Sequence, residues 1–94
     1  MKINISGSIN IPDWAKSVAQ DKYGQIWLFD CNIDDLEPDQ CDHCIKEGTP
    51  WTSIDYIYNG GGIPIENWEL RKFNLKTDKV SIIDGVLVKL CDIW

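Results

Sequence analysis

The residues in this sequence best suited to chemistry are its four cysteines and its single histidine. Cys41 and Cys44 form a CxxC pair that encloses His43, while Cys31 and Cys91 lie on either side along the chain. Two thiolates at this spacing can hold one Zn²⁺ from a turn, and a structural zinc site needs four ligands. The sequence therefore offers a zinc site made of Cys31, Cys41, Cys44 and Cys91, with His43 as a substitute for one distant cysteine.

A second interpretation of the same cysteines involves no metal. Zinc ribbons usually carry two CxxC pairs, and the second pair is missing here. Cys31 and Cys91 are then small buried hydrophobic residues at strand positions, and Cys41 and Cys44 are ordinary thiols of a loop. A thioredoxin-like role needs a thiol pKa lowered at a helix N-terminus, whereas acidic neighbours raise the pKa of a thiol. Redox catalysis is therefore not expected.

Other motifs for catalysis or ligand binding are incomplete. Residues 30–34 begin like a calcium-binding EF-hand loop, but Asp35 and Cys41 stand where that loop needs glycine and glutamate. Residues 59–62, Asn-Gly-Gly-Gly, lack the Lys-Ser/Thr of a phosphate-binding loop and predict a turn. No nucleophile is paired with a base by the sequence, so we expect a protein that is not an enzyme.

The negative charge of the chain is concentrated in one segment. The formal net charge is −6, and residues 30–47 carry seven of the 15 acidic residues but one of the nine basic residues. Such a segment is a solvated surface, steers a basic partner electrostatically, or imitates nucleic acid. Direct binding to nucleic acid or to an anionic membrane is not expected. The residues expected at a contact with a partner are Asp34, Asp35, Glu37, Asp39, Asp42 and Trp51.

The elements that position these residues are predicted to be strands. Alternating isoleucines predict one half-buried strand over residues 2–11. Residues 14–20 and 25–31 predict a hairpin, because the intervening Asp-Lys-Tyr-Gly has turn chemistry. We expect a further hairpin after residues 51–58, and a last one in which Gly85 allows a tight turn between residues 80–84 and 86–90.

The acidic segment itself is predicted to be a long surface loop. Residues 32–49 are polar and interrupted by Pro38 and Gly48, with one short helical turn expected at residues 34–37. As an extended loop, the segment carries one carboxylate per roughly 8 Å of chain, which is sparser than duplex DNA. Loops of this length in a small domain are usually functional or mobile.

Length and composition fit one small folded domain. Of the 94 residues, 44% are hydrophobic and 26% charged, a globular composition with room for one modest core. No apolar run is long enough for a signal peptide or a membrane span, so a cytoplasmic protein with reduced thiols is expected. We therefore predict a single mainly β domain over residues 1–94, built from successive antiparallel hairpins with a long acidic loop and little helix.

Part of the predicted hairpin resembles short phage and prophage proteins of uncharacterised function. The similar residues follow the pattern P-x-W-A-x-x-V-A-x-D-x-x-G before an aromatic strand, and they are Pro12, Trp14, Ala15, Val18, Ala19, Asp21 and Gly24. Residues 67–70, Asn-Trp-Glu-Leu, are similar to a second segment of those proteins, the pattern N-W-x-x-x-L, but with a different spacing. The resemblance implies an accessory protein of a bacterial host cell that binds a host or phage protein with a basic surface. An inhibitor of host defence or a nucleic-acid mimic would fit this description, and no catalytic residue is implied.

Overall fold

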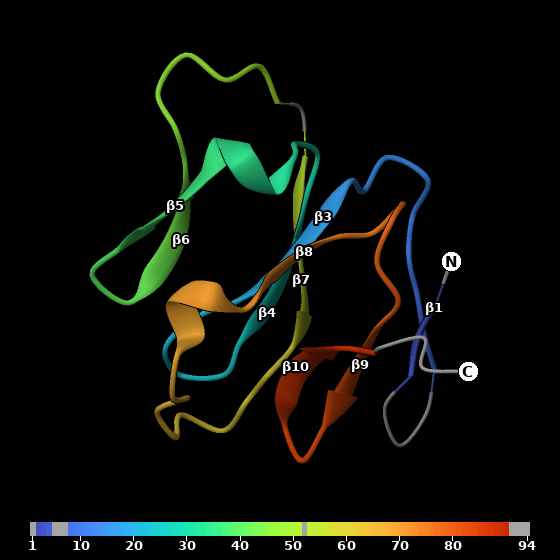
Figure 1. Cartoon of the computed structure of the whole chain (residues 1–94), viewed down its shortest axis with the longest axis vertical. Coiled ribbons are helices and arrows are strands. Elements are labelled where there is room, and N and C mark those ends of the chain that lie inside the picture. The colour runs from blue at the N-terminus through green and yellow to red at the C-terminus, as the bar shows by residue number, and fades with distance from the viewer. Residues whose placement is uncertain (1, 5–7, 52, 91–94) are drawn as a thin grey trace.

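The computed structural model describes residues 2–4, 8–51 and 53–90, and these residues form mainly short β-strands (Figure 1). The strands are β1 (Lys2–Asn4), β2 (Ser8–Asn10), β3 (Ser17–Gln20), β4 (Ile26–Phe29), β5 (Leu36–Asp39), β6 (Asp42–Ile45), β7 (Ile54–Tyr58), β8 (Lys72–Asn74), β9 (Val80–Ile83) and β10 (Val86–Lys89). Helix within the described residues is limited to two 3₁₀ turns, η1 (Ile33–Asp35) and η2 (Trp68–Leu70). The predicted mainly β fold with little helix is confirmed.

An antiparallel sheet with the strand order β7-β4-β3-β8 occupies the middle of the molecule (Figure 1). All residues of β3 are buried, because other elements cover both faces of this central sheet. Val18 and Leu28 point to one face, where they pack against Ile82 and Leu87 of the β9–β10 hairpin. Because side chains alternate along a strand, the neighbouring residues point to the opposite face.

That opposite face carries a second, smaller core. Ala19 and Phe29 pack there with Cys31 and Leu36, and Trp27 and Ile45 cover the edge of this cluster. Leu36 belongs to β5 and Ile45 to β6, so the β5–β6 hairpin forms a third layer on the central sheet. Figure 1 shows this hairpin on one side of the central sheet and β9–β10 on the other.

The remaining sheet has the order β10-β9-β1-β2 and joins segments from both ends of the described chain. β1 pairs antiparallel with β2 and parallel with β9, where Asn4 lies opposite Ser81. Among the described strands, this is the one parallel pairing; β9 and β10 are antiparallel.

A buried amide connects the two large sheets. Gln20 of β3 is inaccessible to solvent, and its Nε2 donates to the carbonyls of Gly24 (3.0 Å) and Gly85 (2.7 Å). Its Oε1 accepts a hydrogen bond from the backbone N–H of Leu87 at 2.8 Å. Two of these three hydrogen bonds, those with Gly85 and Leu87, therefore fix the position of the β9–β10 hairpin on the central sheet, and the bond to Gly24 holds the Gln20 side chain in place.

The structure contains the predicted hairpins at residues 14–31 and 80–90. β3 pairs with β4 across a turn in which the Asp21 carboxylate accepts from the N–H groups of Tyr23 and Gln25. In the β9–β10 turn, Asp84 (φ 52°) and Gly85 (φ 79°) both have positive φ, as a two-residue type I′ turn requires.

Three expectations about strands were wrong. The single strand over residues 2–11 is two strands, β1 and β2, which pair with each other on either side of Gly7 in the sequence. The predicted loop 32–49 contains η1, near the expected helical turn, and the β5–β6 hairpin. The hairpin expected after residues 51–58 is absent from the described residues, because β7 pairs with β4 and the next strand, β8, pairs with β3.

The β5–β6 hairpin forms because its inward face is apolar even though its sequence is acidic. Leu36 lies opposite Ile45, and both pack in the second core against the central sheet. His43, two residues from Ile45 on β6, points to the same side and is buried as well. Gln40 adopts the positive φ (57°) that its tight turn needs. The backbone N–H of Lys22 donates to the carbonyl of Cys41 at 2.9 Å, which ties this turn to the β3–β4 turn.

A close backbone contact holds the β3–β4 turn from the other direction. The N–H of Ile65 donates to the carbonyl of Lys22 at 2.7 Å, and Gly60 lies directly against Gly24. A Cβ atom at Gly60 would lie 2.4 Å from the Gly24 backbone, so only glycine fits there without displacement of the turn.

Candidate functional site

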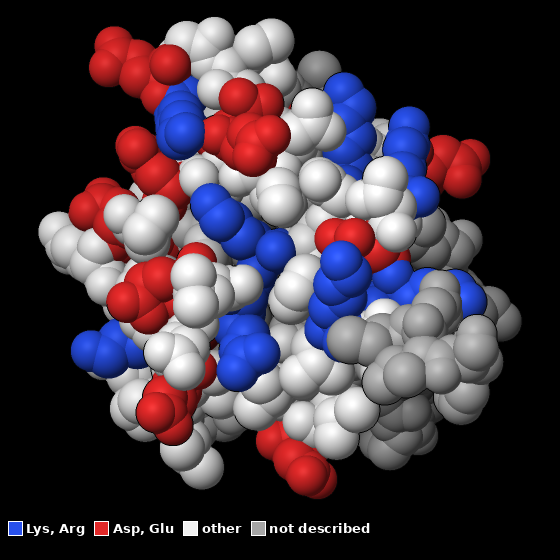
Figure 2. Space-filling view, viewed as in Figure 1, with Lys and Arg blue, Asp and Glu red and all other residues white. Residues whose placement is uncertain are grey.

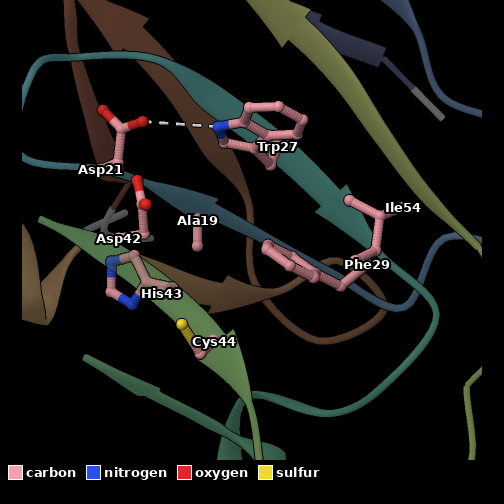
Figure 3. Close-up of a pocket in the computed structure, with 8 residues that line it drawn as sticks. All are labelled: Ala19, Asp21, Trp27, Phe29, Asp42, His43, Cys44 and Ile54. Atoms are coloured by element: carbon pink, nitrogen blue, oxygen red, sulfur yellow. Dashed lines mark hydrogen bonds between the residues drawn. The ribbon is translucent and has the colours of Figure 1, made fainter. Parts of the chain in front are cut away.

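A pocket of about 240 Å³ opens between the central sheet and the β5–β6 hairpin. The pocket is lined by Ala19, Asp21, Trp27, Phe29, Asp42, His43, Cys44 and Ile54 (Figure 3). Trp27, Phe29 and Ile54 come from β4 and β7, whereas Asp42, His43 and Cys44 come from β6. Figure 3 shows the β6 residues across the pocket from Phe29 and Ile54, with Ala19 between them.

The wall formed by the central sheet is aromatic. Trp27 and Phe29 are two residues apart on β4, so both side chains point to the same face, and the small side chain of Ala19 leaves space between the layers. Tyr56 of β7, which is 41% exposed, packs on Trp27 with ring centroids 5.1 Å apart. Ile54 is also exposed, so β7 extends the apolar wall onto the surface.

Asp21 places a carboxylate at one end of this wall. Its side chain is 4% exposed, and its Oδ2 accepts a hydrogen bond from the indole Nε1 of Trp27 at 3.4 Å (Figure 3). Its Oδ1 accepts two backbone N–H bonds of the β3–β4 turn, each 3.0 Å long. Asp21 therefore fixes both the turn and the indole ring of the pocket.

His43 is buried beneath the other side of the pocket. Its Nε2 lies 2.8 Å from the carbonyl of Gln20 and 3.0 Å from that of Trp68, and its ring meets the Trp68 ring edge-on. Because carbonyls only accept hydrogen bonds, Nε2 carries the proton and Nδ1 is an acceptor. Nδ1 is buried and has no partner among the described residues. Burial lowers the pKa of His43, so the ring is held neutral.

The second face of the hairpin, where Asp42 and Cys44 border the pocket, is strongly acidic. Glu37, Asp39 and Asp42 are exposed and share this face with Cys44, because Asp39 lies opposite Asp42 and Glu37 lies opposite Cys44. We call these three carboxylates the acidic face. Burial and then the charges of Asp39, Asp42 and Glu37 raise the pKa of the Cys44 thiol. None of the three acids forms an ion pair with a lysine or arginine within the described residues.

Other residues predicted to contact a partner are more dispersed. Asp34 and Asp35 lie on η1, where Asp34 is exposed and Asp35 half-buried, and Trp51 precedes β7 with 48% of its surface exposed. Figure 2 shows most acidic side chains of the visible face on the side formed by the β5–β6 hairpin, and basic side chains over the middle. The structure thus brings Glu37, Asp39 and Asp42 together.

The cysteines considered for zinc do not form a common site in the described part of the chain. Cys31 is 3% exposed and packs in the second core, and burial raises its pKa, with a further contribution from Asp35. Cys44 lies on β6 beside the acidic residues, where it lines the pocket, and Cys41 lies in the hairpin turn. No three His, Cys, Asp or Glu side chains in residues 2–4, 8–51 and 53–90 are grouped as metal ligands. Cys91 lies outside the described residues, so its part in the zinc hypothesis stays a prediction.

Two features of the pocket were not predicted from the sequence. Asp21 was interpreted as a turn residue, which it is, but its bond to Trp27 depends on the fold. Trp27 and Phe29 were predicted as strand residues without a site. The available signal was the alternation along β4: Trp27 and Phe29 point to one face of the sheet, and the buried Ile26 and Leu28 point to the other.

No protein-family model, curated protein or solved structure matches the chain. Within the described residues, no helix is long and apolar enough to span a bilayer. The site offers an aromatic wall, the carboxylates of Asp21 and Asp42 at the pocket, and those of Glu37 and Asp39 beside it. None of these four acids is in an ion pair within the described residues, and the combination suits positively charged groups.

Proposed function

We propose that this protein is a non-catalytic binding module that attaches to a basic protein surface through its β5–β6 hairpin. The observation that carries the proposal is the acidic face, where Asp39 lies directly opposite Asp42 and neither is neutralised by a described lysine or arginine. Like charges opposite each other destabilise a hairpin. A basic partner relieves this repulsion on binding, which favours the complex over the free protein.

The nucleophilic groups near the pocket support a role without catalysis. Burial and surrounding acids raise the pKa of the Cys44 thiol, whereas a nucleophilic cysteine needs its pKa lowered. The His43 Nε2 proton is shared between two backbone carbonyls, and the ring is buried. These groups form part of the structure and are poorly placed to act as a nucleophile and its base.

The resemblance to phage proteins makes a host or phage protein the partner we favour. The hairpin also supports a partner that normally binds nucleic acid. Opposed strand residues have Cβ atoms about 4.5–5.5 Å apart, so folding brings Asp39 and Asp42 closer than the roughly 8 Å per carboxylate of an extended acidic loop. Carboxylates at this closer spacing match the basic groove of a nucleic-acid-binding protein better than the more widely spaced carboxylates of an extended loop would.

Affinity capture with charge-reversed variants tests this proposal. The immobilised protein is exposed to a bacterial lysate at 50 mM and 500 mM NaCl, and bound proteins are identified by mass spectrometry. The test variant combines Glu37→Lys, Asp39→Lys and Asp42→Lys. The control reverses the same number of exposed acids outside the hairpin, namely Asp13, Glu66 and Glu69.

We expect a partner with a basic surface that is retained at low salt by the wild type and the control, but not by the test variant. Retention should fall at high salt, because exposed charges are screened. Equal loss of binding in both variants would mean that only net charge matters. Retention by the hairpin variant would place the interface elsewhere and refute the proposal.

A further inference from the structure

We infer that the pocket beside the acidic face receives a single arginine side chain of the basic partner. This inference rests on the proposed function and specifies what the partner must present. The pocket combines aromatic walls with carboxylates, and it opens next to Asp42 of the acidic face.

The aromatic wall suits the flat face of a cation. Trp27 and Phe29 line one side of the pocket, and Tyr56 extends the aromatic surface from Trp27 toward solvent. Aromatic rings attract cations over their faces, most strongly in tryptophan, and arginine is the side chain most often found there. The hydrogen bond from the indole Nε1 to Asp21 holds the Trp27 ring in place before a ligand arrives.

The carboxylates of the pocket lack a positive partner of their own. Neither Asp21 nor Asp42 forms an ion pair within the described residues. The ammonium of Lys72 influences His43 from a distance, but it donates to the carbonyls of Ile33 and Leu36 at 3.3 and 3.0 Å. A cation that enters from outside therefore meets the exposed carboxylate of Asp42 and the buried, hydrogen-bonded carboxylate of Asp21, neither of which is in an ion pair within the described residues.

The size of the pocket and its hydrogen-bond acceptors favour one arginine over a larger ligand. A volume of about 240 Å³ lies below the range of about 300–1,000 Å³ that is usual for pockets of drug-sized ligands and cofactors. The carboxylate oxygens of Asp21 and Asp42, both of which line the pocket, are hydrogen-bond acceptors there. A guanidinium group is planar, stacks on aromatic rings and carries five N–H donors for such acceptors, whereas a lysine ammonium has three.

Peptide titrations followed by NMR test this inference without knowledge of the partner. The probe is the acetylated and amidated tripeptide glycyl-arginyl-glycine, added to ¹⁵N-labelled protein. The same tripeptide with citrulline, the neutral isostere of arginine, is the control for charge, and the lysine tripeptide is the control for shape. The Trp27 indole N–H signal, assigned with Trp27→Phe, reports directly on the pocket.

We expect the arginine peptide to produce saturable shifts of the Trp27 indole signal and of the Ala19, Phe29 and His43 amides. The citrulline peptide should bind at least about tenfold more weakly, because it loses the charge-assisted hydrogen bonds. The lysine peptide should bind with intermediate strength. Equal binding of the citrulline and arginine peptides, or shifts confined to the amide signals of Glu37 and Asp39 on β5, would overturn the inference.

A matched pair of variants separates the pocket from general acidity. Asp42→Asn and Asp39→Asn remove the same charge from opposed, exposed positions of one hairpin, but only Asp42 lines the pocket. We expect Asp42→Asn to weaken the arginine peptide by about two- to fivefold and Asp39→Asn to have less effect. Equal weakening would refute an arginine site in the pocket.

The two proposals can fail independently. If the arginine peptide does not bind but the acidic face still captures a partner, the binding function stands and the pocket is not its arginine site. If the peptide binds the pocket and no partner depends on the acidic face, the pocket is a cation site and the proposed function is wrong.

Discussion

The free protein should become more stable when one acid of the β5–β6 hairpin is neutralised, and Asp42→Asn is the variant that shows this. Asp42 lies opposite Asp39, and opposed side chains have Cβ atoms about 4.5–5.5 Å apart. Two unit charges about 5 Å apart in water repel each other by about 0.8 kcal/mol. Screening with a Debye length of about 10 Å at 0.1 M salt leaves about 0.5 kcal/mol, a normal value for exposed charges.

The predicted gain is measurable by thermal unfolding. For a domain of this size, about 0.5 kcal/mol corresponds to a rise in Tm of about 2–4 °C. The gain should fall to about 0.2 kcal/mol, or about 1 °C in Tm, at 1 M NaCl, where the Debye length is about 3 Å. Asp13→Asn, which removes an exposed acid outside the hairpin, is the control for net charge.

A double variant makes this test specific to the pair. Asp39→Asn alone should also raise Tm, but adding it to Asp42→Asn should give less than the sum of the two gains, because the repulsion is already gone. Additive gains, an unchanged Tm, or a gain that is undiminished at 1 M NaCl would refute the argument that the hairpin carries electrostatic strain.

Four further predictions concern the scaffold and its metal dependence. Gly60→Ala should lower the free energy of unfolding, measured in urea, by about 1–3 kcal/mol, because the added Cβ would overlap the β3–β4 turn. Gly61→Ala is the control: its Cβ would meet open space, and the positive φ alone should lower the free energy of unfolding by about 1 kcal/mol. Equal decreases in the two variants would contradict the close contact at Gly60. Burial lowers the pKa of His43, so the unfolded chain takes up its proton first as pH falls below about 6.5 and the wild type loses stability. The Tm of His43→Gln, which keeps a donor for the two carbonyls, should fall less between pH 7 and 5; parallel curves would refute this. Gln20→Leu should lower the free energy of unfolding by about 3 kcal/mol in the same urea measurement, because the buried N–H of Leu87 and the carbonyls of Gly24 and Gly85 lose their hydrogen-bond partner. A decrease of less than about 1 kcal/mol would show that the amide is dispensable for stability. EDTA should leave Tm unchanged, since the described residues contain no group of three metal ligands; a fall in Tm would support the zinc hypothesis.

Local turn chemistry made part of the fold predictable. Asp21 and Gly24 signal the β3–β4 turn, and the Asp84-Gly85 pair has the residues of a type I′ turn, so both hairpins could be read from the sequence. These turns are specified by residues that are neighbours in the chain.

The acidic hairpin could not be predicted in the same way. Its turn uses Gln40 at positive φ, a residue that gives no turn signal, and its inward face contains only a few apolar residues among many acids. Leu36 and Ile45 become a strand pair because the central sheet offers an apolar face to cover. The hairpin is therefore a product of tertiary packing, which local sequence patterns do not record.

The acidic residues of the candidate site were found from composition, but the pocket was not. Charge counting identified Glu37, Asp39 and Asp42 as neighbours in sequence, and the hairpin then placed them on one face. The pocket needs Trp27 of β4 opposite Asp42 of β6, and this pairing follows only from how the layers stack.

The parallel pairing of β1 with β9 has a consequence for the order of folding. Asn4 lies opposite Ser81, so the sheet that contains β1 cannot be completed until synthesis has passed β9. During translation, the central sheet and the acidic hairpin can form before β9 and β10 have been synthesised, when β1 and β2 still lack these two strands of their sheet. Contacts between residues so distant in sequence slow folding, because a large loop must close before they are made. A nascent chain that is released before β9 therefore leaves Val18, Ile26 and Leu28 uncovered, an apolar surface prone to aggregation and to recognition by chaperones.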